Sequence, residues 1–552
     1  MTNSIPEIEN TDVLFVIGSN TTENHPIVAL RMKQAVRNGA KLIIADPRRI
    51  PLVKFAHLWL RQKPGTDATL INCIMHVILK EGLEDREFIK ARTNGIEDLK
   101  KVLQSFTPEL GEQVTGVPKE DIIAAARIYG GAEKAGIYYT MGITQHTMGT
   151  NNVMALADMA MLTGNVGKES TGVNPLRGQN NVQGCCDMGC SPNVLPGYQK
   201  VTDAAVRQKF EEVWGRQIPA EVGLTATEMT EAMIKGSLKG LYVMGENPVL
   251  SDPNMHHTLQ AFKNLDLLVV QDIFLTETAE LADVVLPAAS FAEKDGTFTN
   301  TERRVQRVRK AISPPGDAKD DLTIISLISL RMGYNPVLEN LSALGYALPD
   351  ELDAEKYVTT PEQVFMEAGL LWPGLRGMTY ERLKNGGIQW PCPSQTHPGT
   401  QYLFKDGFPL GRASFVAVPG LVSQEVPDEE YPFILTTGRI LFQYHTGTMS
   451  RRSRVLEAAA PEPFIEVNEI DAERLGIEEA EVLTVVSRRG EINLKARIGN
   501  IVAPGVVFIP FHYKEAAANL LTNDALDPIC KIAEAKVCAV RVEKKMSQES
   551  AA

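Results

Sequence analysis

The chain has 552 residues, 44% of them hydrophobic and 22% charged, a composition typical of a globular protein with about three or four domains. Its 56 basic and 68 acidic residues give a net charge of −12 without a long lysine or arginine run, which argues against a nucleic acid or an anionic membrane as partner. No apolar run approaches the ~20 residues that span a bilayer. The odd number of cysteines, seven, argues against a disulfide framework, so we expect a soluble protein of the cytoplasm.

The first part of the chain repeats one pattern, in which a short apolar run is followed by a turn and a helix. The run at 13–17 ends in a Gly-Ser-Asn turn, and the apolar spacing after it predicts a helix over 26–38. The runs do not alternate with polar residues and are bounded by turn residues, as in parallel strands covered on both faces. We therefore predict a doubly wound α/β domain over 1–178. Its strand-end turns lie at Gly18, Asp46, 64–67 and Met141–Gly142.

A second segment carries the same turns in the same order. Gly18 and Asp46 are 28 positions apart, and Gly245 and Asp272 are 27 positions apart. We therefore predict a second α/β domain over 179–305, which makes the two domains a pseudo-repeat of Rossmann-like nucleotide-binding domains. For either segment taken alone, an ordinary α/β turn is the alternative, because neither holds a complete G-x-G-x-x-G.

Such turns have a specific use at the carboxyl ends of parallel strands. Glycine lets backbone N–H groups approach a phosphate, and the N-terminus of the following helix adds partial positive charge. A carboxylate at the end of the next strand, Asp46 or Asp272, can accept hydrogen bonds from a ribose hydroxyl or a purine amino group. The sequence thus predicts two nucleotide-binding sites.

The pattern changes after the second segment. A charged, proline-broken connection leads into a helix predicted at 322–333, and proline, glycine and tryptophan are frequent beyond it, so 306–425 is expected to be a connecting and peripheral segment. Between 426 and 545, short β-branched runs alternate with polar turns, which predicts a small β-barrel, and the turn "SRRGEI" is the clearest hairpin within it. Residues 546–552 are expected to form a tail.

The stretch "VNPLRGQNNVQGCCDMGCSP", residues 173–192, has neither helical nor strand periodicity and is expected to be an ordered polar loop. It holds one cation, Arg177, among uncharged amides, and binding sites tend to lie on loops of this kind. The alternative for Arg177 is a loop-fixing ion pair, although its nearest acids in sequence are Glu169 and Asp187.

Three cysteines follow in the same stretch. Cys185, Cys186 and Cys190 lack the C-x-x-C spacing of a zinc or iron–sulfur site, so we expect small buried packing residues, with a redox or metal role as the alternative. His146 lies beside a predicted strand end, where a packing role and a role in supporting the site are both open. We predict no metal-ligating residue in this chain.

Several motifs together resemble the molybdopterin oxidoreductases, and within them the catalytic α subunits of molybdenum- or tungsten-dependent formate dehydrogenases. The similarity runs from about residue 10 to about residue 544. Within it, "RGQNNVQG" followed by "CDMG" is specific for the formate dehydrogenase branch. The other motifs are "VIGSNTTENHP", "ADPRR", "KPGTDATL", "MGITQHT", "LTGNVGK", "GENP", "ADVVLPAASFAEKDGTFTNTERRVQ" and "FIPFHY".

This resemblance implies two molybdopterin guanine dinucleotides with Mo or W between them, one dinucleotide for each predicted repeat. It also implies that the barrel at 426–545 is six-stranded and double-psi-like and that it binds the dinucleotide. For the first it implies Gly18, Ser19, Asn20, Asn24, Asp46, Arg48, Gly65 and Asp67. For the second it implies Gly245, Glu246, Asn247, Gln271, Asp272 and Asp295. From the barrel come Thr437, Gly438, Arg439, His445, Thr446, His512, Asn519 and Lys531, and the set is completed by Met141, Gly142 and Gln179.

The resemblance also implies a role for Arg177. A guanidinium can grip a carboxylate with two parallel hydrogen bonds, and in the family this arginine orients formate beside the metal. The implied reaction is oxidation of formate to CO2, or its reverse. Electrons would leave through an iron–sulfur cluster to partner subunits of the iron–sulfur, flavin or hydrogenase type.

The start of the sequence departs from the family pattern. Family members open with a cysteine cluster that binds [4Fe-4S], followed by a metal-ligating selenocysteine or cysteine, whereas the first cysteine here is Cys73. We therefore expect the downstream piece of a selenoenzyme, with little activity as it stands. An in-frame UGA upstream of Met1 would support this expectation, which also leaves a periplasmic location open.

Two other functions stay open at this stage. One is a molybdopterin enzyme with another substrate, such as a nitrate reductase, although the uncharged amides after Arg177 argue against it. The other is a non-catalytic scaffold of the respiratory complex I type, although the intact "GSN", "PGTD" and "GENP" turns argue against loss of the pterin. The choice between Mo and W, the electron acceptor and the direction of the reaction stay open as well.

Overall fold

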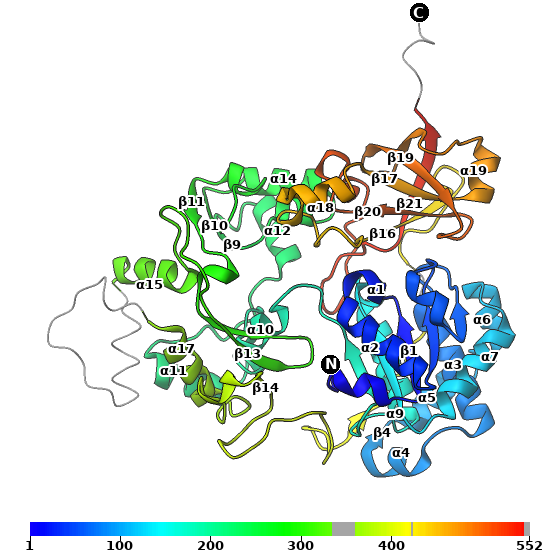
Figure 1. Ribbon diagram of the computed structural model, residues 1–552, viewed down its shortest axis with the longest axis horizontal. Helices are drawn as coiled ribbons and strands as arrows, with labels where there is room; N and C mark the ends of the chain where they lie inside the picture. The colour runs from blue at the N-terminus through cyan, green and yellow to red at the C-terminus, as the bar shows by residue number, and fades with distance from the viewer. Residues whose placement is uncertain (334–358, 421–422, 546–552) are drawn as a thin grey trace, which may run out of the picture. The chain divides into compact units, whose positions relative to one another are not determined.

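The computed structural model describes residues 1–333, 359–420 and 423–545 (Figure 1). They form two compact units. Unit 1 contains Met1–Gly178, Leu250–Thr258 and the chain from Tyr402 onward, and unit 2 contains Gln179–Val249 and Leu259–Gln401. The predicted tail and residues 334–358 of the predicted connecting segment lie outside the described residues. The predicted domain boundaries stay predictions, because each compact unit combines segments that are distant in sequence and does not mark where a domain begins or ends.

Unit 1 is built on a five-stranded parallel sheet. Its strand order is β3-β2-β1-β5-β6, so β1 lies between β2 and β5. Short apolar runs form these strands because both faces of the sheet are covered and every side chain of β1 is buried. The strands are β1 (Val13–Ile17), β2 (Lys41–Ala45), β3 (Leu58–Leu60), β5 (Ala135–Tyr139) and β6 (Gly172–Pro175).

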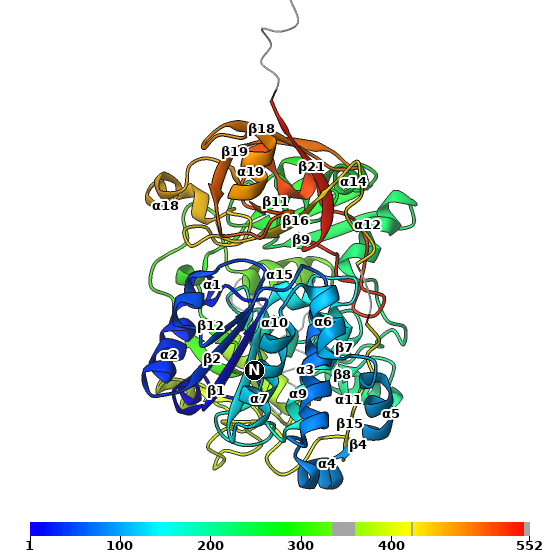
Figure 2. The same cartoon turned by 90° about the vertical axis from the view of Figure 1, so that its right-hand side faces the viewer.

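Alternate residues of β1 enter two separate cores. Phe15 and Ile17 pack in the cluster formed with α3, α7 and α9, whereas Leu14 and Val16 pack in the cluster formed with α2. Figure 2 shows α2 on one side of β1 and β2, and α3 and α7 on the other. The helices are α1 (Thr21–Asn24), α2 (Pro26–Arg37), α3 (Asp67–Glu81), α4 (Arg86–Arg92), α5 (Ile96–Leu103), α6 (Pro108–Thr115), α7 (Lys119–Gly130), α8 (Met141–Thr144) and α9 (Gly149–Leu162).

The second element of unit 1 is a closed six-stranded barrel with the order β16-β20-β17-β19-β18-β21. Its core is apolar, and the predicted "SRRGEI" hairpin is the antiparallel pair of β18 and β19. The mixed α/β architecture with a closed six-stranded barrel is therefore confirmed. The strands are β16 (Phe433–Gly438), β17 (Phe464–Asn468), β18 (Val482–Val486), β19 (Glu491–Gly499), β20 (Val506–Pro510) and β21 (Cys538–Lys544), and the helices are α18 (Arg454–Ala459) and α19 (Glu469–Leu475).

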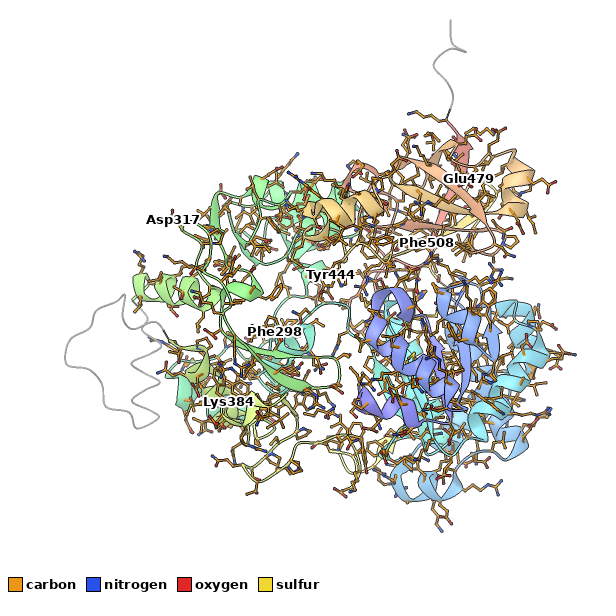
Figure 3. All side chains as sticks on the ribbon, viewed as in Figure 1. Phe298, Asp317, Lys384, Tyr444, Glu479 and Phe508 are labelled. Carbon is orange, nitrogen blue, oxygen red and sulfur yellow. The ribbon has the colours of Figure 1, made fainter. Side chains whose placement is uncertain are left out.

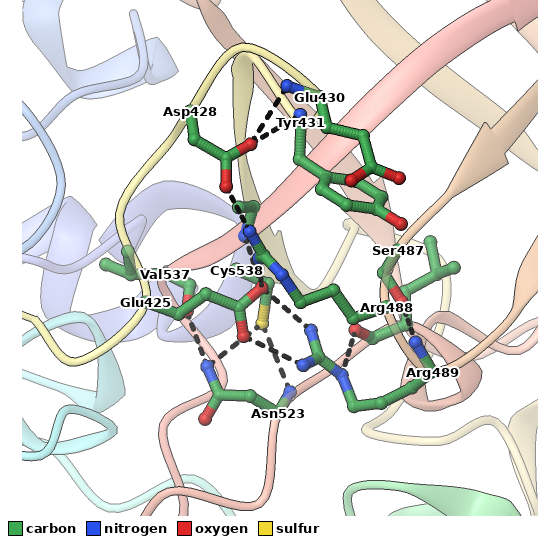
Figure 4. Close-up of polar contacts among 12 residues, drawn as sticks. Glu425, Asp428, Glu430, Tyr431, Ser487, Arg488, Arg489, Asn523, Val537 and Cys538 are labelled. Carbon is green, nitrogen blue, oxygen red and sulfur yellow. Dashed lines mark hydrogen bonds and ion pairs between the residues drawn. The ribbon is translucent and has the colours of Figure 1, made fainter.

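Glu425 fastens the chain that enters the barrel to two of its strands (Figure 4). Its carboxylate accepts hydrogen bonds from Arg489 at 2.8 and 3.0 Å, from Arg488 at 3.1 Å and from the backbone N–H of Ala539 at 2.9 Å. Arg488 also contacts Asp428. Because the carboxylate meets two guanidinium groups and a strand N–H, it fixes the entry of the chain to the hairpin and to β21.

Unit 2 contains a three-stranded parallel sheet of order β11-β10-β9 and a three-stranded antiparallel sheet of β12, β13 and β14. One face of the parallel sheet is partly open, since Tyr242 and Met244 of β9 are 42% and 50% exposed. The strands are β7 (Val194–Leu195), β8 (Gln199–Lys200), β9 (Gly240–Met244), β10 (Leu267–Asp272), β11 (Val284–Pro287), β12 (Gly296–Thr299), β13 (Arg304–Val308) and β14 (Ile388–Gln389).

Helices follow the strands of unit 2, and short elements complete both units. The predicted helix at 322–333 is α15, one residue earlier at its start. The helices are α10 (Val182–Asp187), α11 (Ala204–Trp214), α12 (Ala226–Ile234), α13 (Pro248–Ser251), α14 (Met255–Lys263), α15 (Asp321–Arg331) and α17 (Pro361–Leu371). The small pair of β4 (Thr93–Asn94) and β15 (Ala413–Ser414) belongs to unit 1. Short 3-10 helices lie at Pro6–Asn10, Pro51–Phe55, Ala279–Leu281, Phe291–Glu293, Arg382–Lys384, Ser450–Arg452, Lys514–Ala516 and Ala518–Leu520.

Among the described residues, none of the helices combines the length and the apolar character that a membrane crossing requires.

Candidate cofactor and substrate site

The carboxyl ends of β1 and β5 form the centre of the candidate site in unit 1. Strand order reverses between these two strands, and ligands of open α/β sheets bind at such a switch point. Gly18 follows β1 with φ of 55°, and its carbonyl accepts hydrogen bonds from Gly142 N–H at 3.2 Å and from Thr140 Oγ1 at 2.7 Å. A Cβ on Gly18 would lie 2.8 Å from the carbonyl carbon of Gly142. Two predicted turns thus meet backbone to backbone.

The ends of β2 and β3 extend this edge. Asp46 is buried after β2 and accepts a hydrogen bond from the Arg48 N–H at 2.9 Å. Gly65 precedes α3 with φ of 82°, and a Cβ there would lie 2.5 Å from Ser423 Oγ. Asp67, the first residue of α3, is buried and accepts a hydrogen bond from Gln62 at 3.0 Å. The predicted residues of the first half-site therefore share one sheet edge.

Arg48 joins this edge to the barrel. Its guanidinium donates to Glu466 of β17 through two nitrogens at 2.8 to 3.1 Å, and the two side chains are only 14% and 10% exposed. The same guanidinium lies 3.4 Å from the ring centre of Phe508 of β20, which is labelled in Figure 3. Because the pair is forked and shielded from water, the barrel loops are held close to the strand ends.

Arg177 lies two residues beyond β6, at the same edge. Its carbonyl contacts His25 Nε2 at 2.7 Å, and the next carbonyl, of Gly178, lies 3.5 Å from Arg439 Nη1. The Arg177 side chain is half-buried near Tyr139. Burial raises the pKa of Tyr139 to about 12, and the charge of Arg177 opposes this rise. Residues of the sheet edge and of the barrel thus fix the backbone of Arg177.

Two histidines beside Arg177 are neutral near pH 7. Burial lowers the pKa of His25, and burial together with the nearby charge of Arg439 lowers the pKa of His445 to about 4. Arg439 Nη1 lies 3.2 Å from His445 Nε2, so the imidazole nitrogen acts as an acceptor. Positive charge at this place therefore comes from the guanidinium groups of Arg177 and Arg439.

A buried acid–base cluster lies behind the strand ends. His146 Nε2 is 2.9 Å from the Gly142 carbonyl and 3.9 Å from Asp67, and its Nδ1 is 3.7 Å from Glu534. Burial alone would lower the pKa of His146, but Glu534 and the charge of Asp67 outweigh it and raise the pKa. Burial raises the pKa of Asp67. His146 is therefore a buried polar group of the site, one of the two roles left open by the sequence.

Asp46 and Lys536 form a second pair of buried charges. Burial raises the pKa of Asp46 to about 6, although Arg48 and Lys536 oppose the rise. Burial, with the nearby charges of Arg439 and Arg48, lowers the pKa of Lys536 to about 8. Lys536 Nζ donates to the Thr437 carbonyl at 2.8 Å. Two ionisable groups with shifted pKa values at a sheet edge are typical of a functional site.

Unsatisfied polar atoms test whether this edge fits a polar cofactor. Buried polar atoms nearly always have hydrogen-bond partners in folded proteins. Within residues 1–333, 359–420 and 423–545, however, several buried atoms at the strand ends and on the facing barrel loops have no hydrogen-bond partner. They are Asn20 Oδ1, Thr22 Oγ1, His25 Nδ1, Gln62 Oε1, His146 Nδ1, Ser423 Oγ, His512 Nδ1, His512 Nε2 and Glu534 Oε2. An edge with this many free donors and acceptors fits a ligand rich in phosphate, hydroxyl and amide groups.

Most predicted residues of the second half-site, in unit 2, already have protein partners. Asn247 accepts from Thr278 at 2.8 and 3.1 Å and donates to Glu277 at 2.8 Å. Gln271 contacts Tyr242 and donates to Asp321 at 2.6 Å. Three of the remaining four differ in setting. Asp272 accepts from the backbone of Ile273 and Phe274, Glu246 has its pKa raised by burial, and Gly245 has φ of 65° with open space around its Cβ position.

Several other predicted positions make contacts that serve the fold. Thr437 donates to the Ala535 carbonyl at 2.8 Å, and Asn519 donates to the Leu250 and Ser251 carbonyls at 3.0 and 2.9 Å. Asp295 accepts from the Lys310 N–H at 3.3 Å. The rest hold the following positions: Ser19 and Asn24 beside α1, Met141 exposed at the start of α8, Gln179 exposed, Gly438 at the end of β16, Thr446 and His512 on barrel loops, and Lys531 with φ of 62°.

Two expectations for residues 173–192 are wrong. The stretch is not loop throughout, because it enters β6 and contains the helix α10. Cys185 and Cys190 are exposed rather than buried packing residues. The reason is that both lie where α10 ends in a tight glycine turn, and the periodicity of a six-residue helix is too short to read from the sequence.

Four site residues escaped the sequence analysis: Ser423, Glu466, Glu534 and Lys536. Glu534 and Lys536 are charges placed directly before the apolar strand β21, where buried charge is rare unless it has a role. That signal could have singled them out. Ser423 and Glu466 carry no comparable signal, since only the fold brings them to Gly65 and Arg48.

Comparisons with known proteins agree with this geometry. Residues 1–331 match the family model of molybdopterin oxidoreductases, and residues 433–539 match the molydopterin dinucleotide binding domain. These two matches confirm the predicted cofactor class.

The chain is 53% identical to the F420-dependent formate dehydrogenase subunit alpha of Methanocaldococcus jannaschii, over 99% of this chain and 78% of that protein. It is 40% identical to formate dehydrogenase H of Escherichia coli, over 100% and 75%. It is 36% identical to the assimilatory nitrate reductase catalytic subunit of Bacillus subtilis, over 98% and 76%. The acetylene hydratase of Pelobacter acetylenicus shares the fold, with a TM-score of 0.75 at 20% identity over 98% and 79% of the two chains. The chain therefore belongs to the molybdopterin oxidoreductase family.

Proposed function

We propose that this chain is the catalytic subunit of a formate dehydrogenase, which oxidises formate to CO2 or runs the reverse reaction. One observation carries the proposal: an arginine, Arg177, lies two residues beyond β6, on the same sheet edge as the glycine turns and unsatisfied polar atoms that fit a dinucleotide. The 53% identity to a named formate dehydrogenase subunit supports it. The 36% identity to a nitrate reductase leaves nitrate as the substrate to test against.

The cofactor would be a pair of molybdopterin guanine dinucleotides carrying Mo or W, and it supplies the two-electron redox chemistry when bound. In unit 1, the turns at Gly18, Gly65 and Gly142 would let the backbone come close to phosphates, and Asp46 would accept hydrogen bonds from the nucleoside. Arg439, His445 and His512 of the barrel, a double-psi-like one in our proposal, would contact the pterin.

The second dinucleotide would belong to unit 2, at Gly245, Asn247, Gln271 and Asp272. The equal order of turns in the two sheets supports a pseudo-repeat of Rossmann-like halves. Because Asn247 and Gln271 already have protein partners, their contribution would be to hold the strand-end loops in place, and Gly245, with open space around it, would approach the ligand.

Arg177 would bind the substrate through its charge and shape. Formate carries one negative charge on two equivalent oxygens, and a guanidinium matches them with two parallel hydrogen bonds. The product CO2 is neutral, so the ion pair is lost as the product forms, and release is favoured. His25 and His445, neutral near pH 7, add no charge that would hold a second anion.

Electrons and protons must leave the site. Oxidation of formate yields CO2, one proton and two electrons, and we propose that the electrons pass to partner subunits that carry iron–sulfur, flavin or hydrogenase centres. Because the Methanocaldococcus jannaschii relative is named as F420-dependent, F420 is our proposed final acceptor.

The test is substitution of Arg177 in the cofactor-loaded enzyme. Arg177→Lys keeps the charge and loses the fork, so kcat/KM for formate should fall by about 10- to 100-fold, the equivalent of one charge-assisted hydrogen bond. Arg127→Lys, an exposed arginine paired with Glu81, is the matched control and should leave kcat/KM unchanged. Formate-dependent reduction of a dye is the assay.

Two results would contradict the proposal. Unchanged kcat/KM in Arg177→Lys would remove Arg177 from the substrate site. Dye-dependent reduction of nitrate by the unmodified enzyme, without formate oxidation, would show that the substrate class is wrong.

A further inference from the structure

Helix α10 ends in a Schellman motif that brings two cysteines together. The N–H of Cys190 donates to the Cys185 carbonyl at 3.2 Å, and the N–H of Gly189 donates to the Cys186 carbonyl at 3.1 Å. These are the 6→1 and 5→2 hydrogen bonds of the motif, with Gly189 in the left-handed conformation at φ of 80°. The first bond joins the backbones of Cys185 and Cys190 directly.

In this motif the side chains of the two residues joined by the 6→1 bond usually touch, most often as a pair of apolar groups. Here both are thiols, and the Cys185 S–H forms a hydrogen bond with the sulfur of Cys190. Both cysteines are exposed, whereas Cys73, Cys392 and Cys538 are buried. An accessible thiol pair in contact has the arrangement that a dithiol needs in order to close to a disulfide.

The chemistry of the two thiols is unequal. The hydrogen bond from Cys185 lowers the pKa of Cys190 to about 6, which leaves Cys190 largely as thiolate at pH 7. The same hydrogen bond raises the pKa of Cys185, and burial, the neighbouring cysteines and Glu246 add to the rise. Thiolate is the attacking species in disulfide exchange. We therefore assign to Cys190 the attack on the small disulfide and to Cys185 the later attack on the mixed disulfide.

We propose that Cys185 and Cys190 form a redox-active dithiol that is oxidised reversibly by low-molecular-mass disulfides. The Cys190 thiolate attacks one sulfur of the small disulfide, which forms a mixed disulfide and releases one thiolate. Cys185 then gives up its proton and attacks the Cys190 sulfur, which releases the second thiolate. Counted from the dithiol, with the proton that Cys190 loses on ionisation included, the protein gives up two electrons and two protons, and the small disulfide is reduced to two thiols.

Cys186 is not part of the pair. It is only half-exposed, and it precedes the end of the helix, so the Schellman hydrogen bonds do not bring it to Cys190. Cys186→Ser is therefore a matched control. Cys530, an exposed cysteine elsewhere in the chain, shows how an accessible thiol outside the pair reacts with glutathione.

The experiment uses the full chain in buffers with increasing ratios of oxidised to reduced glutathione. Samples are quenched in acid, free thiols are alkylated, and the peptides are analysed by mass spectrometry. We expect a Cys185–Cys190 disulfide that forms and reverses with the buffer in the unmodified protein and equally in Cys186→Ser. In the unmodified protein quenched early under limiting oxidised glutathione, the mixed disulfide should be found on Cys190 at least about tenfold more often than on Cys185, because the pKa of Cys190 is the lowered one.

Three outcomes would overturn the proposal. The first is separate glutathione adducts on Cys185 and Cys190 with the same dependence on the buffer as the adduct on Cys530. The second is loss of the disulfide in Cys186→Ser, which would assign the bond to another pair. The third is an equal share of the early mixed disulfide on Cys185 and on Cys190 in the unmodified protein, which would show that neither thiol is activated. Far-UV circular dichroism of each variant establishes that it is folded.

Discussion

At the scale of single residues, the buried charges Asp46 and Lys536 define the candidate site. Transfer of a charged group from water into the interior disfavours its charged form, so the pKa of an acid rises and that of a base falls. Asp46 and Lys536 show both shifts, each with burial as the main cause. Their retention at a sheet edge that fits a ligand indicates that they serve binding rather than stability.

The shift of Asp46 predicts a specific pH dependence of stability. Its pKa rises from 3.8 to about 6, so the folded protein binds the proton more tightly than the unfolded chain does. The resulting stabilisation is complete below pH 3.8 and is lost as the pH rises through 6. Between pH 4 and pH 7 the unmodified protein should therefore lose about 2 kcal/mol of its free energy of unfolding through Asp46. Asp46→Asn has no such loss, so the free energy of unfolding of the variant should rise relative to that of the unmodified protein by the same amount.

Urea unfolding at both pH values measures this difference. In Asp46→Asn, the amide oxygen of the substituted side chain can still accept the hydrogen bond from the Arg48 N–H, so the turn itself is kept. A constant difference between pH 4 and pH 7 would mean that Asp46 titrates alike in the folded and unfolded chains.

At the scale of elements, the turn after β1 and the turn after β5 touch through their backbones. Gly18 is needed for two reasons, its φ of 55° and the 2.8 Å between its Cβ position and Gly142. A left-handed conformation is costly for any other residue, and overpacking adds a separate cost.

Gly18→Ala should therefore destabilise the protein by about 2–4 kcal/mol, from backbone strain and overpacking together. Gly476→Ala at the end of α19 is the control, since its φ is 65° and its Cβ position is 3.9 Å from the nearest atom. That variant should lose only about 1 kcal/mol, the strain alone. Urea midpoints of the two variants measure the difference, and equal losses would show that the two turns do not constrain each other.

The pair of Arg48 and Glu466 links the strand ends to the barrel. In a double-mutant cycle with alanine, we expect a coupling free energy of about 1.5–3 kcal/mol, because the pair is forked and shielded from water. The exposed pair of Arg127 and Glu81 has the same chemistry and should show no measurable coupling. Similar values for the two pairs would contradict the idea that Arg48 holds the barrel to the sheet edge.

At the scale of the whole molecule, the buried polar atoms without hydrogen-bond partners indicate which segments the cofactor should stabilise. A ligand that binds only the folded chain stabilises it by mass action, and the segments that contact it gain most. Nine of the buried polar atoms without hydrogen-bond partners in the described residues lie in the strand-end segments of unit 1 and on facing barrel loops.

Removal of the cofactor should therefore lower the Tm and increase amide hydrogen exchange at 18–25, 62–67 and 142–147. The hairpin of β18 and β19, at 482–499, should exchange at the same rate with and without cofactor, which makes it an internal control. Equal exchange in the strand-end segments of both forms would contradict the assignment of this edge to the dinucleotide.

Features that depend on residues close together in the sequence could be predicted from the sequence, whereas features that depend on contacts between distant segments could not. The strand that ends at Gly18 and the hairpin of β18 and β19 were predictable, because apolar runs and turn residues are local signals. The contact of Gly18 with Gly142, the position of Lys536 behind Asp46 and the meeting of Cys185 with Cys190 depend on strand order, barrel closure and a helix end. No local pattern contains that information.

The path of the chain through unit 1 has a consequence for its biosynthesis. The sheet edge is complete once Gly178 has been made, but the barrel closes only when β21 pairs with β16 and β18. Roughly 360 residues separate Gly178 from β21, which at about 5–20 residues per second is roughly 20–70 s on the ribosome. Throughout that interval the nascent polypeptide lacks the closed barrel, so the candidate site, which includes residues of the barrel loops, is complete only after β21 has been made.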